Sequence, residues 1–188
     1  MYATLLADAT FHDFLLACDR DLATQARRRG CRFCWSAVHS AHYRRKPRGR
    51  RCHLGPEHDW RFSLCCARHG CRTRKTPPSL RFLGPKVYLA ATIILMAVLH
   101  EGATPARIRR LNEFVGVDRR TVARWRSFWR LLTASSFWQA ARAAFMPPVD
   151  QTRLPPAMLE RFAGDAAERM TALLRFLAPI TGGQVQAL

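Results

Sequence analysis

Acidic residues are scarce in this chain. Its 188 residues include 13 Asp and Glu against 31 Lys and Arg, which leaves a formal net charge of +18 at pH 7. Lysine is rare as well, because Lys46, Lys75 and Lys86 are the only ones. A GC-rich genome would explain the preference for arginine but not the shortage of acids. This excess of positive charge indicates a polyanionic partner, and planar guanidinium groups are well suited to bind phosphates.

Long apolar runs are missing too. The longest, residues 87–99, is shorter than the roughly 20 residues that span a bilayer, so it predicts a buried core helix. The first residues lack a basic stretch and contain Asp8 and Asp13, unlike a signal peptide. An apolar content of 48% supplies a core and excludes a disordered tail. We therefore expect a cytoplasmic, nucleoid-associated protein with no membrane partner.

Seven cysteines are present, and in a cytoplasmic chain they are expected to be metal ligands or core residues rather than disulfides. Cys31 and Cys34 have the spacing that lets two thiolates occupy adjacent corners of a zinc tetrahedron. Residues 31–75 have too few apolar side chains for a core of their own, so this region needs a bound metal or another cross-link to stay folded. We predict a zinc ribbon with a structural zinc ion. The predicted ligands are Cys31, Cys34, Cys66 and Cys71, with Cys65 and His69 as substitutes.

Other cysteines and histidines leave alternatives open. Cys52 and His53, together with His58, form an alternative second site or supply a replacement ligand. A catalytic zinc ion needs an open coordination position with a general base beside it. The only acids nearby are Glu57 and Asp59, so the predicted site is interpreted as structural.

A basic segment, residues 43–51, lies between the two cysteine pairs. Its cations are Arg44, Arg45, Lys46, Arg48, Arg50 and Arg51. Held on a rigid ribbon, such a run is expected to lie along a phosphate backbone or to enter a groove. A solvated loop that attracts nucleic acid non-specifically is the alternative. His39 and His42, just upstream, are interpreted as surface or phosphate-contacting residues.

Apolar residues recur at helical spacing through most of the remaining chain, which predicts a mainly α fold. In the first predicted helix, residues 10–29, Phe14 and Cys18 fall on the apolar face and Asp19 faces away. The predicted organisation is an N-terminal helix (1–30), a zinc ribbon with a basic loop (31–80), a helical domain (86–145), a proline-bounded linker (146–156) and an amphipathic C-terminal helix (157–178).

The helical domain contains the pattern of a helix-turn-helix over residues 104–130. Thr104 is a typical N-cap and Pro105 suits the first helical position. Gly116 ends the first helix, and Asp118 caps the second. The predicted inward side chains are Ile108, Leu111, Val115, Val122, Trp125 and either Phe128 or Trp129.

The outer face of the second predicted helix is basic. It carries Arg119, Arg120, Ala123, Arg124 and Ser127, with Thr121 at its edge. The amino-terminal end of such a helix enters the major groove in the known docking geometry. We therefore predict that DNA is contacted by Arg119, Arg120, Thr121 and Arg124. An ordinary helical hairpin is the alternative, but crowding three arginines on one face costs stability and so favours a binding role.

These motifs, in this order, resemble a known family. Cys31-x-x-Cys34, the second cysteine pair leading into residues 72–75, and the run from Gly116 to Trp125 are similar to the amino-terminal zinc-ribbon and helix-turn-helix region of certain bacterial insertion-sequence transposases. The resemblance covers about residues 30–130. It implies binding to the terminal inverted repeats of a mobile element.

The chain departs from that family in its acids. In the family, a separate ribonuclease-H-like domain carries an acidic triad that holds magnesium. After Trp129 this chain has only Asp150, Glu160, Asp165 and Glu168, the last three expected on one helix. Strand-transfer chemistry is therefore expected to be absent, and the chain is not predicted to be an enzyme.

We conclude from the sequence that the chain is a sequence-specific double-stranded DNA-binding module, either an accessory protein or a truncated transposase relative. A helix-turn-helix transcriptional regulator and an RNA-binding zinc-ribbon protein are the alternatives. A nuclease or deaminase that uses the zinc ion ranks last, because the deaminase pattern of H-x-E with P-C-x-x-C is missing. The last helix either packs on the same core or pairs with a second copy of the chain, which would form a homodimer. A separate catalytic subunit is the other candidate partner.

Overall fold

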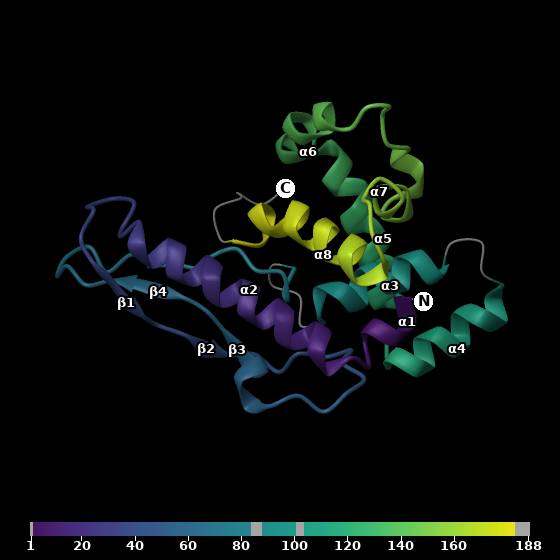
Figure 1. The fold of residues 1–188 in the computed structure, drawn as a ribbon, viewed down its shortest axis with the longest axis horizontal. Coiled ribbons are helices and arrows are strands. Elements are labelled where there is room, and N and C mark those ends of the chain that lie inside the picture. The colour runs from purple at the N-terminus through teal and green to yellow at the C-terminus, as the bar shows by residue number, and fades with distance from the viewer. Residues whose placement is uncertain (1, 84–87, 101–103, 183–188) are drawn as a thin grey trace.

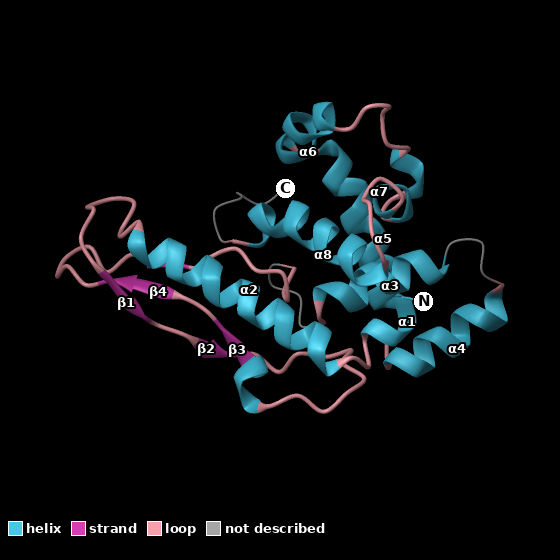
Figure 2. Cartoon of the chain, in the orientation of Figure 1, coloured by secondary structure: helices cyan, strands magenta, loops and turns pink. Residues whose placement is uncertain are grey.

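The computed structural model describes residues 2–83, 88–100 and 104–182. The chain is mainly helical, with a few short strands (Figure 2). Figure 1 shows the strands at one end and most of the helices at the other, with the long helix α2 (Ala9–Arg28) running beside the strands. None of the described helices is both long and apolar enough to cross a bilayer.

The strands form one long, interrupted hairpin with a third strand at its end. β1 (Val38–Ser40) pairs antiparallel with β4 (Leu64–Cys66), and β2 (Tyr43–Arg44) pairs with β3 (Trp60–Arg61). β5 (Arg74–Lys75) joins β4, which gives the order β1-β4-β5. A short 3-10 helix, Pro56–Asp59, precedes β3.

His42 lies at the interruption of this hairpin. Its Nδ1 lies 3.1 Å from the backbone nitrogen and 3.0 Å from the carbonyl oxygen of Ser63, and its ring meets Phe62 edge to face. This nitrogen is therefore engaged inside the hairpin, and the interpretation of His42 as a surface or phosphate-contacting residue stays a prediction. His39, on β1, is exposed as expected.

The buried face of α2 differs from the expected one. Its buried residues are Phe11, His12, Leu15, Leu16, Asp19, Ala23 and Ala26. Asp19, expected to face away from the core, is 1% exposed, whereas Phe14 is 45% exposed. Both expectations were wrong, because α2 packs against the hairpin and the segment that follows it as well as against the helices. Cys18 is half-buried against the core, as predicted.

A buried polar cluster joins α2 to the hairpin. The Asp19 carboxylate accepts hydrogen bonds from the Ser79 hydroxyl (2.6 Å), the Leu80 N–H (2.7 Å) and Nε of Arg81 (2.9 Å). The Arg81 guanidinium also donates to the carbonyls of His58 (3.0 Å) and Trp60 (2.8 Å). The segment after β5 is thereby held between α2 and β3.

The helical part packs around α3 (Ala90–His100). The run from Ala90 to Met96 is buried, which confirms the prediction of a core helix, although residue 87 of the expected run lies outside the described residues. The helices that contact α3 are α4 (Pro105–Val115), α5 (Arg119–Ala134) and α8 (Ala166–Leu177). The short helices are α1 (Tyr2–Leu5), α6 (Ser136–Ala141), α7 (Pro156–Leu159) and the 3-10 turns Arg142–Ala144, Gln151–Arg153 and Ala178–Thr181.

The C-terminal part also differs from expectation. The single helix expected over residues 157–178 is divided into α7 and α8, because Gly164 adopts φ +95° and Asp165 caps α8. Its apolar residues nevertheless reach the common core, among them Met158 and Met170. The expected linker, residues 146–156, packs on that core as well, because Val149 is buried and α7 begins at its end.

Candidate metal centre and nucleic-acid interface

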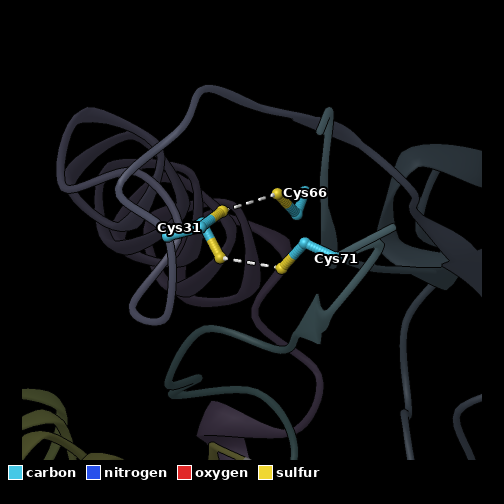
Figure 3. Close-up of side chains that lie close together, drawn as sticks. Cys31, Cys66 and Cys71 are labelled. Carbon is cyan, nitrogen blue, oxygen red and sulfur yellow. Dashed lines mark hydrogen bonds between the residues drawn. The ribbon is translucent and has the colours of Figure 1, made fainter. Parts of the chain in front are cut away.

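Four cysteine sulfurs converge where the turn after α2 meets the end of β4 (Figure 3). Sγ of Cys31 lies 3.7 Å from Sγ of Cys71, and Sγ of Cys34 lies 3.4 Å from Sγ of Cys66. All four sulfurs lie within 4.8 Å of one another. Sulfurs bound at about 2.3 Å to one tetrahedral zinc ion would lie about 3.8 Å apart. The predicted ligand set is thus assembled, and it could hold a metal ion.

Both cysteine turns end in a left-handed residue. The carbonyl of Cys31 accepts the N–H of Trp35 (2.9 Å), and the N–H of Cys31 donates to the carbonyl of Ser36 (3.0 Å). Trp35 directly follows Cys34 and has φ 60°, while Arg72 directly follows Cys71 and has φ 43°. This conformation is unusual for large side chains, so each turn is held by its hydrogen bonds and its neighbours.

Hydrogen bonding and burial shift the pKa values of these thiols in opposite directions. The side chain and backbone of Ser36 lower the pKa of Cys34 to about 6. Burial raises the pKa of Cys66 to about 12. The side chain and backbone of Thr73 lower the pKa of Cys71. A divalent cation favours the thiolate form at every ligand, so binding would release protons.

The two substitute ligands lie outside the sulfur cluster. Cys65 precedes Cys66 in β4, and neighbouring residues of a strand point to opposite faces of a sheet. Its Sγ lies 3.4 Å from the carbonyl oxygen of Arg72. The side chain of His69 is exposed in the turn. The geometry therefore favours Cys66 and Cys71 as the second ligand pair.

The alternative second site is not assembled. His58 is buried, and its Nε2 lies 2.9 Å from the carboxylate of Asp13. His53 is exposed, and burial raises the pKa of the half-buried Cys52 thiol. In the part of the chain that the structure describes, the four cysteines form the only group of three or more potential ligands.

The turn between α4 and α5 has the predicted capping. The Thr104 side chain accepts the N–H of Arg107 and begins α4. Gly116 ends α4 in the left-handed conformation, at φ 68°, which glycine adopts without steric cost. The Asp118 carboxylate accepts the N–H of Thr121 (2.7 Å) and begins α5.

The two faces of α5 also follow the prediction. Its buried aromatic and aliphatic residues include Val122, Trp125 and Trp129. Arg120 and Arg124 are exposed one turn apart on the other face. Thr121 is half-buried, and its hydroxyl donates to Asp118 (3.1 Å), so it is already engaged at the helix cap. Arg119 belongs to α5, but its side chain lies outside the described part of the chain.

Tyr88 connects this turn to the basic segment. Its hydroxyl donates to the carbonyl of Gly116 (3.0 Å), and its ring meets Trp125 of α5 edge to face at 5.1 Å. Its backbone forms a β-bridge with Arg48, in which the N–H of Leu89 donates to the Arg48 carbonyl (3.0 Å). One residue therefore contacts the helix turn, the second helix and the basic segment.

Two further contacts hold the basic segment against the helices. The guanidinium carbon of Arg51 lies 3.6 Å from the ring centroid of Phe114 in α4. The Thr92 hydroxyl of α3 donates to the carbonyl of Gly49 (3.0 Å). The segment begins in β2 and ends on the helical part, so it is not a solvated loop along its whole length.

The cations of the basic segment lie in different environments. The Arg44 guanidinium lies over Trp60 at 5.3 Å, and that of the half-buried Arg45 lies 5.4 Å from the centroid of Phe82. Arg50 forms an ion pair with Asp59 at 3.4 Å. The side chains of Lys46 and Arg48 are exposed.

The comparisons with known proteins identify no relative. No family model matches the chain, and no curated protein or solved structure is similar to it. Its function is therefore inferred from the arrangement of its own residues.

Sequence reasoning missed the residues that join the two basic regions. Tyr88 lies at the edge of the longest apolar run, where the sequence indicates only a core residue. The signal available in the sequence is an aromatic residue, Phe114, in a helix rich in arginine. The structure leaves its side chain 45% exposed. Its contact with Arg51 joins segments far apart in the sequence, so local spacing does not reveal it.

Proposed function

We propose that the chain is a DNA-binding module of a mobile element, which recognises a specific double-stranded sequence and carries out no strand transfer itself. In this proposal α5 enters the major groove and the basic segment follows the adjacent phosphate backbone. The observation that carries it is the connection through Tyr88 and through Arg51 on Phe114. These contacts hold the basic segment against α4 and the turn before α5, and in this proposal basic residues from two distant parts of the sequence act as one surface.

The two parts of this surface have different roles. Arg120 and Arg124 are exposed one turn apart, so both can reach base edges in one groove, and each bidentate contact to guanine discriminates by about 1–3 kcal/mol. Lys46 and Arg48 of the basic segment are exposed cations, which suit phosphates and contribute affinity without sequence preference.

The metal in this proposal is zinc, with a structural role in a zinc ribbon. Four cysteines fill the tetrahedral positions and leave none open for a substrate, as in structural rather than catalytic zinc sites. Elemental analysis of the purified protein should give one zinc ion per chain. A four-sulfur site also suits iron, which would be recognised by its visible absorbance.

The carboxylates after Trp129 support a module without a magnesium-binding triad. Asp150 caps a 3-10 turn by accepting the N–H of Thr152 (2.9 Å), and Glu160 pairs with Arg153 (3.0 Å). Asp165 and Glu168 form the capping box of α8. The three acids expected on one helix are thus divided between α7 and α8, and each of the four has a structural partner.

Selection from a random pool of DNA duplexes tests the proposal. The zinc-loaded protein is used at two salt concentrations, beside Arg124→Ala and, as a control, Arg142→Ala, whose exposed side chain follows α6. We expect a motif that survives the higher salt and that depends on Arg124 but not on Arg142. Retention that disappears with salt and leaves no motif would refute sequence-specific binding.

The same experiment separates the remaining functions. Two half-sites about one DNA turn apart would indicate a homodimer and favour a transcriptional regulator. A single asymmetric motif would favour binding to an element end beside a separate catalytic subunit. Preference for structured RNA over duplex DNA at equal salt would favour an RNA-binding protein.

A further inference from the structure

Two large aromatic side chains are exposed on the turn that carries Cys31 and Cys34. Phe33 is 59% exposed and Trp35 is 79% exposed. The other tryptophans are half-buried, as is Trp60, or no more than 4% exposed. Aromatic rings normally gain stability from burial, so two neighbouring exposed rings add little to the fold and indicate a binding role.

Trp35 is held in place by its backbone. Its N–H donates to the carbonyl of Cys31 (2.9 Å), and its φ of 60° is rare for a bulky residue. The adjacent Ser36 carbonyl accepts the N–H of Cys31 (3.0 Å), which closes the turn. A ring on a fixed turn loses little conformational entropy when it binds a ligand, because its backbone is already ordered.

The surroundings of the two rings are basic. The guanidinium carbon of Arg32 lies 4.5 Å from the centroid of the Phe33 ring, and Arg68 and Arg72 are exposed on the facing cysteine turn. The sequence contains no acid between Asp21 and Glu57 or between Asp59 and Glu101. These cations also offset the negative charge of four thiolates on a divalent ion.

We infer that this surface binds single-stranded nucleic acid, with unpaired bases stacked on Trp35 and Phe33 and phosphates beside the arginines. The knuckle surface, as we call it, consists of Arg32, Phe33, Trp35, Arg68 and Arg72. Stacking platforms among basic side chains are the usual means of binding single strands. In a duplex the base faces are covered by neighbouring bases. An acidic protein segment would satisfy the arginines but would leave the rings without a flat partner.

The knuckle surface lies at the opposite end of the molecule from α5 (Figure 1). α2, which connects the two regions, has 20 residues and so extends about 30 Å. The inference therefore goes beyond the proposed duplex binding and names a second ligand on a separate surface.

Tryptophan fluorescence tests the inference, because Trp35 is far more exposed than the other tryptophans. The zinc-loaded full chain is titrated with oligothymidylate of about 12 nucleotides, with oligouridylate of the same length, with a duplex that lacks the selected motif, and with polyglutamate. We expect the single strands to quench the exposed emission and to bind more tightly than the duplex. The two single strands distinguish DNA from RNA as the source of the bases.

Trp35→Gly is the variant best suited to the structure, since glycine adopts φ 60° without strain. We expect the binding of fluorescein-labelled oligothymidylate to weaken by roughly tenfold or more, with metal content and melting temperature unchanged. Binding is followed here by fluorescence anisotropy of the labelled strand, because this variant lacks the reporting tryptophan. Met146→Ala removes a side chain that is 81% exposed in the helical part, and it should bind like the parent. Should Trp35→Gly lose the metal, Phe33→Leu applies the same test, because it leaves the Cys31–Trp35 hydrogen bond in place.

Several results would overturn the inference. One is that the tryptophan emission stays unquenched at saturating oligothymidylate. Another is that Trp35→Gly and Phe33→Leu both bind oligothymidylate as tightly as the parent does. The third is that polyglutamate binds more tightly than the single strands. Arg124→Ala should leave oligothymidylate binding unchanged. A failure at the knuckle surface is thereby distinguished from a failure of duplex recognition by α5.

Discussion

Asn in place of Asp19 would test the contact between α2 and the hairpin. Asn keeps the shape of the side chain but removes its charge, and it places an amide NH2 among three donors. Those donors are the Ser79 hydroxyl (2.6 Å), the Leu80 N–H (2.7 Å) and Nε of Arg81 (2.9 Å). Arg81 is 2% exposed, so its guanidinium would stay buried without a counter-charge.

The expected loss is large. Removing one partner of a buried ion pair costs about 3–5 kcal/mol of unfolding free energy. Arg81 keeps its hydrogen bonds to the carbonyls of His58 and Trp60, which places the expected loss near the lower limit, at about 3 kcal/mol. Since whole domains are stable by only about 5–15 kcal/mol, the variant loses a substantial share of its stability.

Urea denaturation of the zinc-loaded protein, followed by the fluorescence of the buried tryptophans, measures this loss. Asp21→Asn is the matched control, because Asp21 lies on the same helix and is exposed, and its effect should stay within about 0.5 kcal/mol. In the double variant Asp19→Leu, Arg81→Met neither charge of this ion pair is left buried without its partner, so it should be less destabilised than Asp19→Asn. A loss of less than about 1 kcal/mol for Asp19→Asn would refute the role of this ion pair.

Four further changes test the metal site, the DNA contacts and the N-cap of α5. Cys31→Ser should release the metal and lower the melting temperature, whereas Cys65→Ser should keep the metal content and the melting temperature of the parent. Elemental analysis measures the metal and calorimetry the melting temperature. Full metal content in Cys31→Ser would contradict the four-sulfur site. Arg124→Ala should reduce base discrimination by about 1–3 kcal/mol in competition with single-base variants of the selected motif, and an unchanged preference would move recognition away from α5. Replacing Arg44, Lys46 and Arg48 together by Gln should weaken binding to all duplexes. It should also reduce the slope of the logarithm of the binding constant against the logarithm of the salt concentration by up to about 3. A loss of binding limited to one sequence would contradict phosphate contacts. Hydrogen bonds from Thr121 hold the pKa of Asp118 below its usual 3.8. The stabilisation of α5 by the Asp118 cap is therefore fully present above pH 3.8 and is lost as the pH falls toward the lowered pKa. Asp118→Asn should remove this acid-dependent step in a circular dichroism titration.

Features decided within a few residues could be predicted from the sequence. The cysteine spacing predicted Cys31 and Cys34, because two thiolates on one short turn are already close. For the second pair Cys65 and His69 stayed as substitutes, and the tertiary structure is what brings Cys66 and Cys71 to the other two sulfurs. The N-caps at Thr104 and Asp118 and the end of α4 at Gly116 were also predicted correctly, because capping depends on residues within one helical turn. The capping box of Asp165 and Glu168 is equally local, and it begins a new helix inside the single helix that the apolar stripe predicts.

Features that depend on a distant partner could not be predicted in this way. Asp19 looked like a solvent-facing residue because nothing near it in the sequence indicates that Arg81 is its partner. Phe14 matched the helical period, yet no described element covers it fully. Val149 was assigned to a linker, although the segment packs on the helical core.

The sequence by itself determined the local elements of this protein: the two cysteine turns, the capped helices α4 and α5, the buried α3 and the excess of positive charge. These follow from the spacing, the capping residues and the composition, which act over one or two helical turns. Only the tertiary structure decided which charges are buried, and that Tyr88 and Arg51 join the basic segment to the helices. It also decided that Trp35 stays exposed, because burial depends on elements brought together by the whole chain.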